Sequence, residues 1–553
     1  MDNARVIAAI IFAGSVILLA DAWFKAQLPP PSDTQTVESQ SAQVSGDSTV
    51  PEVTQAPSAD NAMPTVSAAQ PVSSSSRVVT VTTDLFEARI NTLGGVLQQL
   101  KLLEHYSKDD PDRTLELFMK ESERTYVAQS GLIGSGLPNH ATLFEIDGDH
   151  FEMAAGADKL KLEFRAVTPD RHEVVQRYTF NRGSYVIDVD YEIVNLGTEP
   201  ISGHAYFQFL RDGNPAAGDS KMQPTYTGAA IYTEESKFTK VDFDDMDKGK
   251  ASYPKKTEDG WAAFLQHYFV AAWLPEQGVE REYFTKARDN GLYAVGIILP
   301  VASIAPGDVG SVASRLYAGP QEQKTISQLA PGLELTVDYG WLTVIAAPLF
   351  WLLSTLHGWV GNWGVAIILL TVIIKLIFYP LSAASYKSMA KMRVLAPKLQ
   401  ALKETYGDDR QRMQQAMMEM YKTEKINPLG GCLPILVQIP VFIALYWVLL
   451  ASVELRNAPF ILWIDDLSAK DPYYVLPVLM GLSMIVQSWL SPTPPDPVQA
   501  KIMKIMPVVF SIFFFFFPAG LVLYWLVNNI LSIAQQWHIT RAIERSKPAN
   551  ATH

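Results

Sequence analysis

The sequence contains a single cysteine, Cys432, among its 553 residues. One thiol cannot build an intramolecular disulfide framework, and because no cysteine follows the N-terminal apolar run, lipid attachment there is also excluded. The sequence carries no P-loop and no zinc-protease helix, and its apolar segments hold no Ser/His/Asp grouping. We therefore expect a protein that is not an enzyme and that needs neither a metal nor another cofactor.

Basic residues are missing from one long stretch, because no Lys or Arg lies between Lys25 and Arg77. Residues 26–76 are rich in Pro, Ser, Gln, Thr and Ala, a composition that cannot bury enough apolar surface to offset the entropy of ordering. We predict a disordered linker. Residues 1–25 carry Arg5 and a run of about 15 apolar residues, with no clear cleavage site beside it. We interpret them as an uncleaved membrane anchor rather than a signal peptide.

Charge of either sign is rare in several long runs. Hydrophobic residues make up 48% of the chain, and uncharged runs of about 18 residues or more are transmembrane candidates. The runs are Val6 to Ala20, Trp341 to Leu381, Leu433 to Ala451, and several between Tyr473 and Trp537. We predict a polytopic α-helical membrane protein. The formal net charge of −12 does not indicate a nucleic-acid partner, because the acidic residues dominate the soluble part of the chain.

Residues 77–338 consist of short stretches of alternating apolar and polar residues, the pattern of half-buried strands. Two such stretches flank Asn181 to Ser184, which we predict to form a hairpin turn. The segment therefore predicts a large β-sandwich domain, which lies on the outer side of the membrane if Arg5 is inside. Asp188 and Asp190 resemble a pair of catalytic carboxylates, but two acids at this spacing are more typical of a solvated strand face.

Residues 339–358 are apolar but short, and they contain Pro348. They either span the membrane or lie in its interface as an amphipathic helix. The loop from Ser382 to Cys432 holds nine Lys and Arg residues against five Asp and Glu residues. Since basic loops favour the cytoplasmic side, we predict the interfacial helix, which leaves this loop inside.

Residues 384–426 have the spacing of a cytoplasmic helical hairpin. Pro397 must kink or start its first helix. Methionines recur along both expected helices, and flexible methionines suit adaptable binding surfaces. They could equally pack the two helices together. The candidate contact residues are Met389, Met392, Met417 and Met420.

Residues 359–540 are predicted to form a core of five spans that includes this hairpin, followed by a cytoplasmic tail, residues 541–553. The spans after the first are Leu433 to Ala451, broken by Pro434 and Pro440, then Tyr473 to Leu490, Ile505 to Phe517, and Leu521 to Trp537. With the N-terminal anchor, the chain then has six spans and both termini in the cytoplasm, an arrangement that agrees with the charges of its loops.

Lys375 is the thirteenth residue of the nineteen-residue run from Trp363 to Leu381. A charge within hydrocarbon costs several kcal/mol unless it faces protein or water. From its depth alone, Lys375 could equally reach the inner headgroups by snorkelling. Thr371, Gln438 and Asn528 favour a shared cavity that admits water, because polar groups in neighbouring spans are best satisfied together.

Several strings in this chain resemble the YidC/Oxa/Alb family of membrane protein insertases, in its bacterial YidC type with a large periplasmic domain. The resemblance covers nearly the whole chain, and the strings occur in the family's order. They are VGNWG (Val360 to Gly364), YPL (Tyr379 to Leu381), SMAKMR (Ser388 to Arg393), NPLGGCLP (Asn427 to Pro434), VELR (Val453 to Arg456), DPYY (Asp471 to Tyr474) and GLVLYW (Gly520 to Trp525).

The resemblance implies a hydrophilic intramembrane groove in the inner membrane of a Gram-negative bacterium. The family's positive groove residue is usually arginine, and Lys375 stands at that position. Lysine keeps the charge but lacks the planar five-donor fork. The wall that contacts the substrate maps to Thr371, Tyr524 and Trp525. The implied partners are nascent membrane proteins, the Sec translocon, membrane lipids, and the ribosome and signal recognition particle receptor pathway, although the short tail leaves ribosome contact open.

Two other functions compete with insertion. A secondary transporter or channel would use Lys375 as its coupling residue, but no repeat of broken helices is present. A membrane-anchored carbohydrate-active enzyme would work through the β-rich domain and would lose its function if residues 80–320 were largely deleted. An insertase is expected to tolerate that deletion broadly.

Overall fold

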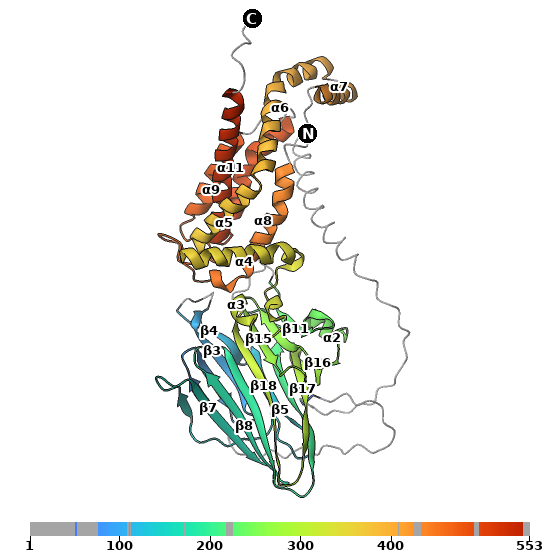
Figure 1. Cartoon of the computed structure of the whole chain (residues 1–553), viewed down its shortest axis with the longest axis vertical. Coiled ribbons are helices and arrows are strands. Elements are labelled where there is room, and N and C mark those ends of the chain that lie inside the picture. The colour runs from blue at the N-terminus through green and yellow to red at the C-terminus, as the bar shows by residue number, and fades with distance from the viewer. Residues whose placement is uncertain are drawn as a thin grey trace, which may run out of the picture. The chain divides into compact units, whose positions relative to one another are not determined.

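The computed structural model describes residues 50–51, 76–107, 110, 112–170, 172–216, 225–407, 409–423, 433–490 and 497–545. The expected anchor, nearly all of the expected linker and the end of the tail lie outside these residues. The described residues form a β-rich domain of two sheets followed by a helical region (Figure 1).

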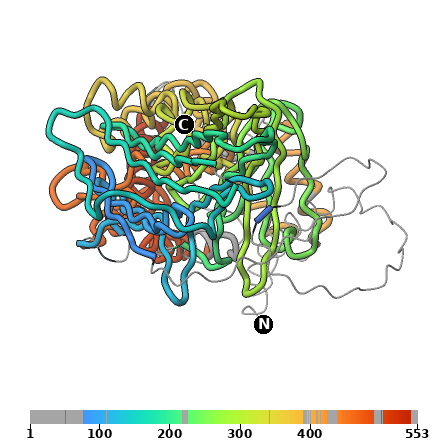
Figure 2. The backbone as a smooth tube through the Cα atoms, turned by 90° about the horizontal axis from the view of Figure 1, so that it is seen from below, coloured from blue at the N-terminus to red at the C-terminus, as the bar shows by residue number. Residues whose placement is uncertain are grey.

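The first sheet has ten strands and the second has eight. In spatial order, the first consists of β13 (Lys256–Thr257), β16 (Arg281–Arg288), β17 (Leu292–Ile304), β10 (Ile201–Asp212), β5 (Thr125–Ile133), β4 (Thr114–Lys120), β3 (Val96–Tyr106), β2 (Phe86–Asn91), β1 (Val78–Thr82) and β6 (His150–Glu152). The second consists of β12 (Lys237–Val241), β11 (Gly228–Thr233), β14 (Trp261–Gln266), β15 (Phe269–Leu274), β18 (Val309–Pro320), β9 (Val186–Asn195), β8 (His172–Asn181) and β7 (Lys159–Val167). Figure 2 traces the same strands from below, from blue at β1 to yellow-green at β18.

The two sheets share one hydrophobic core. Phe207 on β10 of the first sheet packs against Trp273 on β15 of the second, with ring centroids 5.2 Å apart. The period of two that places alternate side chains on one face of a strand is clear in β9, where Ile187 and Val189 are fully buried. The domain is therefore a two-layer sandwich, as the alternating sequence predicts.

The hairpin between β8 and β9 confirms the predicted turn. Gly183 has φ +67°, a conformation that glycine adopts without steric cost. On the outer face of the hairpin, Asp190 accepts a 2.8 Å bond from Arg177, and Asp188 accepts one from Asn181 at 3.1 Å. These contacts are those of a solvated strand face.

The helical region follows the short elements α2 (Phe243–Asp247) and α3 (Gln323–Ile326). Its helices are α4 (Thr343–Val360), α5 (Trp363–Ile377), α6 (Tyr379–Tyr406), α7 (Arg410–Thr423), α8 (Leu433–Ala451), α9 (Val475–Leu490), α10 (Pro497–Phe514) and α11 (Ala519–Arg545). Figure 1 shows α4 lying crosswise to α5, α8, α9 and α11.

The corner between α4 and α5 follows from two adjacent residues. Gly361 adopts φ +67° and donates its N–H to the carbonyl of His357, which ends α4. Asn362 then caps α5, because its side-chain oxygen accepts the N–H of Val365 at 3.0 Å. The His357 ring stacks on Trp363 with centroids 4.0 Å apart and holds the two helices together.

Prolines affect the helices differently from the sequence-based expectation. The helix expected from Trp363 to Leu381 ends at Ile377, and α5 meets the start of α6 at 63°. Pro380 lies in the first turn of α6, where its missing N–H is tolerated but where it cannot continue α5. Pro397 does not start a helix, because α6 runs through it.

Pro440 does not break α8, which runs unbroken through it, and Pro434 lies in the first turn of the same helix. Two other helices also exceed their predicted bounds. α10 begins at Pro497 rather than near Ile505, and α11 continues to Arg545.

Among the described residues, one helix, α4, is long and apolar enough to cross a membrane by length and composition. α5 and the first part of α6, Tyr379–Ser388, pass the same test as a bent pair. Three shorter apolar helices are Gln438–Ala451, Val475–Leu490 and Lys504–Phe514.

Candidate functional site

Lys375 lies near the end of α5 with only 7% of its surface exposed. Its ammonium donates a 2.7 Å hydrogen bond to the hydroxyl of Ser532 on α11. The Ser532 hydroxyl in turn donates to the carbonyl of Asn528 on its own helix, also at 2.7 Å. The lysine therefore faces a polar partner on a neighbouring helix, and the snorkelling alternative does not describe this structure.

A second polar bridge joins α8 to the same face of α11. The amide nitrogen of Gln438 donates to the side-chain oxygen of Asn528 at 2.6 Å. Asn528 and Ser532 are four residues apart, so their side chains lie on one face of α11. The structure thus brings Lys375, Gln438 and Asn528 together and adds Ser532. Thr371, which the sequence also suggests for this group, instead donates its hydroxyl within its own helix.

A small cavity lies beside the lysine. Its volume is about 10 Å³, which is room for about one water molecule. Three of its lining residues are polar and come from three helices. The lining consists of Ile374, Lys375, Phe378, Leu381, Ser382 and Gln438, which we call the Lys375 cavity.

The residues expected to form a wall for the substrate are largely buried. Thr371 donates its hydroxyl to the carbonyl of Ile367 at 2.7 Å, within its own helix. Tyr524 is 1% exposed and stacks on Phe442 of α8. Trp525 is half-buried and meets the same phenylalanine edge to face, with ring centroids 4.2 Å apart. Phe442 thus joins α8 to both aromatic residues of α11.

α11 has a second polar face, which is directed toward α9. Asn529 donates to the hydroxyl of Ser483 at 3.3 Å, and Gln536 donates to the carbonyl of Leu490 at 2.9 Å. Sequence reasoning missed Ser532, Ser483 and Gln536. The four-residue spacing from Asn528 is a signal that could have indicated Ser532, whereas nothing in the local sequence pairs Ser483 with Asn529.

The methionines of the expected hairpin lie on α6 and α7. Met417 and Met420 are half-buried, and the neighbouring Met418 is 57% exposed. The side chains of Met389 and Met392 are outside the described part of the chain. α7 therefore presents at least one exposed thioether between two half-buried ones.

Both the β-rich domain and the helical region match known protein families. Residues 78–352 match the family described as the YidC periplasmic domain, and residues 355–547 match the 60Kd inner membrane protein family. A protein of Nitrosospira multiformis named membrane protein insertase YidC is 55% identical over 560 residues, covering 99% of this chain and 98% of that protein. The chain belongs to the YidC family of membrane protein insertases.

Other YidC proteins extend this similarity. The membrane protein insertase YidC of Methylobacillus flagellatus is 55% identical over 552 residues, covering 99% of this chain and 98% of that protein. A solved structure titled "Active YidC insertase crystal structure with the first transmembrane domain resolved" is 19% identical, covers 83% of this chain and 92% of its own, and has a TM-score of 0.39. The transporter alternative finds no support among these relatives.

Proposed function

We propose that this chain receives nascent hydrophobic segments at the Lys375 cavity and releases them into the inner membrane, alone or with the Sec translocon. The observation that carries the proposal is the buried ammonium of Lys375, held by Ser532 at 2.7 Å between separate helices. The free energy of burying a cation is lower in such a polar site than in hydrocarbon. The Lys375 ammonium can therefore remain charged there and attract the acidic part of a client chain.

Insertion of the client would be driven by electrostatic attraction and hydrophobic partitioning rather than by a chemical reaction. Acidic or polar residues of the client approach Lys375, while its apolar segment moves into lipid along α8 and α11. A cavity of about 10 Å³ holds no peptide segment, so the receiving state requires α8 and α11 to separate near Phe442. That separation would also expose Tyr524 and Trp525 to the client.

The proposed membrane arrangement has six spans with both termini in the cytoplasm. α4 lies in the periplasmic interface in this arrangement. The exposure of Trp351 and Trp359, 68% and 76%, supports this position, because tryptophan favours the membrane–water boundary. The crosswise direction of α4 in Figure 1 also supports it. The α6–α7 hairpin would then meet clients in the cytoplasm through the methionines of α7, and ribosome and signal recognition particle receptor contacts belong on the same side.

Charge reversal at Lys375 tests the proposal. Lys375→Glu should abolish insertion of clients with acidic translocated tails, and Lys375→Arg should retain it, because only the first variant repels the tail. The measurement is complementation of insertase-depleted cells together with insertion of a reporter client. Equal activity of the two variants, at equal protein level, would contradict the electrostatic role.

Site-specific photocrosslinking tests the path of the client. A crosslinker at Thr371 or Trp525 should capture a ribosome-stalled client whose hydrophobic segment has just emerged. A crosslinker at the exposed Trp359 of α4 serves as the control and should capture less. Crosslinks from Trp359 alone would contradict the proposed path.

A further inference from the structure

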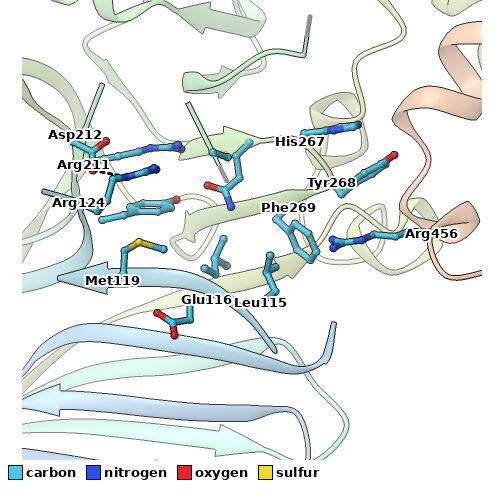
Figure 3. A pocket seen from close by; sticks show the side chains of 14 residues that line it. Leu115, Glu116, Met119, Arg124, Arg211, Asp212, His267, Tyr268, Phe269 and Arg456 are labelled. Atoms are coloured by element: carbon cyan, nitrogen blue, oxygen red, sulfur yellow. Dashed lines mark ion pairs between the residues drawn. The ribbon is translucent and has the colours of Figure 1, made fainter. Parts of the chain in front are cut away.

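A separate pocket lies between strands β4, β5 and β10 of the first sheet, the turn from β14 to β15 of the second sheet, and Arg456 (Figure 3). Its volume is about 50 Å³, and its lining includes three arginines, Arg124, Arg211 and Arg456, against two carboxylates, Glu116 and Asp212. Figure 3 shows Arg124, Arg211 and Asp212 on one side of the pocket and Arg456 on the other.

The two acids of the pocket have protein partners for most of their carboxylate oxygens. Asp212 accepts the backbone N–H groups of Thr125 at 2.7 Å and of Asn214 at 2.9 Å. Asp212 also forms an ion pair with Arg124, whose Nε lies 3.6 Å from its carboxylate. Glu116 pairs with Arg113 at 3.0 Å through one oxygen, while its other oxygen is buried without a partner among the described residues. In Figure 3 the Glu116 carboxylate points away from Arg124, so it does not serve as the acceptor for that donor.

Two donors of the pocket lack acceptors among the described residues. The hydroxyl of Tyr126, a residue only 4% exposed, has no hydrogen-bond partner there. The Nε of Arg124 is also without a hydrogen bond, since its nearest carboxylate oxygen, on Asp212, lies at 3.6 Å. Burial raises the pKa of Tyr126, so the phenol stays protonated and acts as a donor. Buried donors of this kind call for an acceptor.

From this geometry we propose that the pocket binds a carboxylate group presented by a peptide, with Tyr126 and Arg124 as its donors. Guanidinium and phenol groups both donate to carboxylate oxygens, and such charge-assisted bonds are the stronger ones. The volume accommodates about four water-sized groups, the size of an acetate ion. A hexose ring is too large for it, so a sugar is not the expected ligand. The proposal is independent of the Lys375 cavity.

The experiment measures binding of N-acetyl-glutamate amide to the full chain in detergent by calorimetry, with N-acetyl-glutamine amide as the neutral control. The glutamate compound should bind saturably and the glutamine compound should not. Tyr126→Phe should weaken binding about tenfold, as expected when a hydrogen bond to a charged group is lost. Its folding should be unchanged, because the hydroxyl has no hydrogen-bond partner among the described residues. Arg124→Gln should weaken binding at least as much.

Arg165→Gln is the matched control, because Arg165 on β7 pairs with Glu163 and Glu173 at an exposed site. It should bind the glutamate compound with the affinity of the unmodified chain. Equal binding of the two probes, or unchanged affinity in both Tyr126→Phe and Arg124→Gln, would overturn the proposal. Tighter saturable binding of inorganic phosphate, of phosphatidylglycerol in bicelles or of glucose at the same residues would also overturn it, in favour of a phosphate, lipid or sugar site.

Discussion

Lys375 and Ser532 are 157 residues apart in the chain, yet the ammonium of one donates directly to the hydroxyl of the other. The serine hydroxyl is oriented by its own bond to the carbonyl of Asn528, so its lone pair is available to the cation. An ionised group buried between helices thus has a fixed partner, and the position of its charge depends on that partner.

The first prediction concerns this partner. Ser532→Ala removes the acceptor and should reduce insertion of clients with acidic tails about tenfold or more, the effect of losing a hydrogen bond to a charged group, about 1.5 kcal/mol or more. Ser532→Thr keeps the hydroxyl and should stay close to the unmodified rate. Pulse-labelled protease protection of a reporter client measures both. A loss of the same size for a client without acidic residues would assign Ser532 to packing instead.

The second prediction is a coupling between α8 and α11. Gln438→Leu and Asn528→Leu each break the 2.6 Å bridge, and the double variant should be destabilised by less than the sum of the two. The difference should be about 0.6 to 1.7 kcal/mol, the range for hydrogen bonds between membrane helices. Unfolding in mixed micelles provides the free energies. Additive effects would show that the two side chains do not support each other.

The sequence predicts those parts of the molecule that depend on local pattern. The strands of the sandwich follow from their alternation, and β9 keeps Ile187 and Val189 inside. The charge of Lys375 in an apolar run indicates the candidate site, because such a residue has few physically acceptable environments. Gln438 and Asn528 are recognisable for the same reason, since amides within apolar helices need partners.

Other parts of the site depend on tertiary contacts that no local pattern specifies. Ser532 is a small polar residue of a type common in membrane helices, so only its position opposite Lys375 gives it a role. Pro380 and Pro440 both lie in apolar sequence but have opposite effects. The chain bends between α5 and α6 at Pro380, whereas α8 runs unbroken through Pro440. A proline within a helix leaves one backbone carbonyl without its usual N–H donor, and neighbouring helices can satisfy that carbonyl. How those helices are arranged cannot be predicted from the local sequence.

The third prediction concerns pH. Glu454 accepts the N–H of Gln323 at 3.2 Å, but its second oxygen has no partner in the described structure. Burial raises the pKa of Glu454 from its ordinary 4.5 to about 7, and Glu322 adds to the rise. The folded chain therefore binds this proton more tightly than the unfolded chain, so stability falls as pH rises from about 4.5 through 7.

Glu454→Gln should remove this dependence. Each pKa unit corresponds to about 1.4 kcal/mol, so the variant should be more stable above about pH 7 by up to roughly 3 kcal/mol and nearly unchanged below about pH 5. Thermal unfolding in detergent across this range measures the effect. Glu123→Gln, at an exposed position, should leave the pH profile as it is. If the stability of the Glu454→Gln variant depended on pH as steeply as that of the unmodified chain, this carboxyl would be excluded as the cause of the pH dependence.

The last prediction concerns a close contact between α5 and the segment that precedes α9. A Cβ atom added at Gly364 would overlap the ring of Phe460, whereas one added at Gly358 of α4 meets no atom within 4 Å. Gly364→Ala should therefore destabilise the folded chain by about 1 to 3 kcal/mol, the usual cost of overpacking. Gly358→Ala should be neutral or stabilise by about 0.5 to 1 kcal/mol, because alanine loses less backbone entropy in a helix. Thermal unfolding of the two variants in detergent gives the comparison. Equal midpoints would mean that the Phe460 ring moves aside freely, and Gly364 would then not be required for α5 to pack at this position.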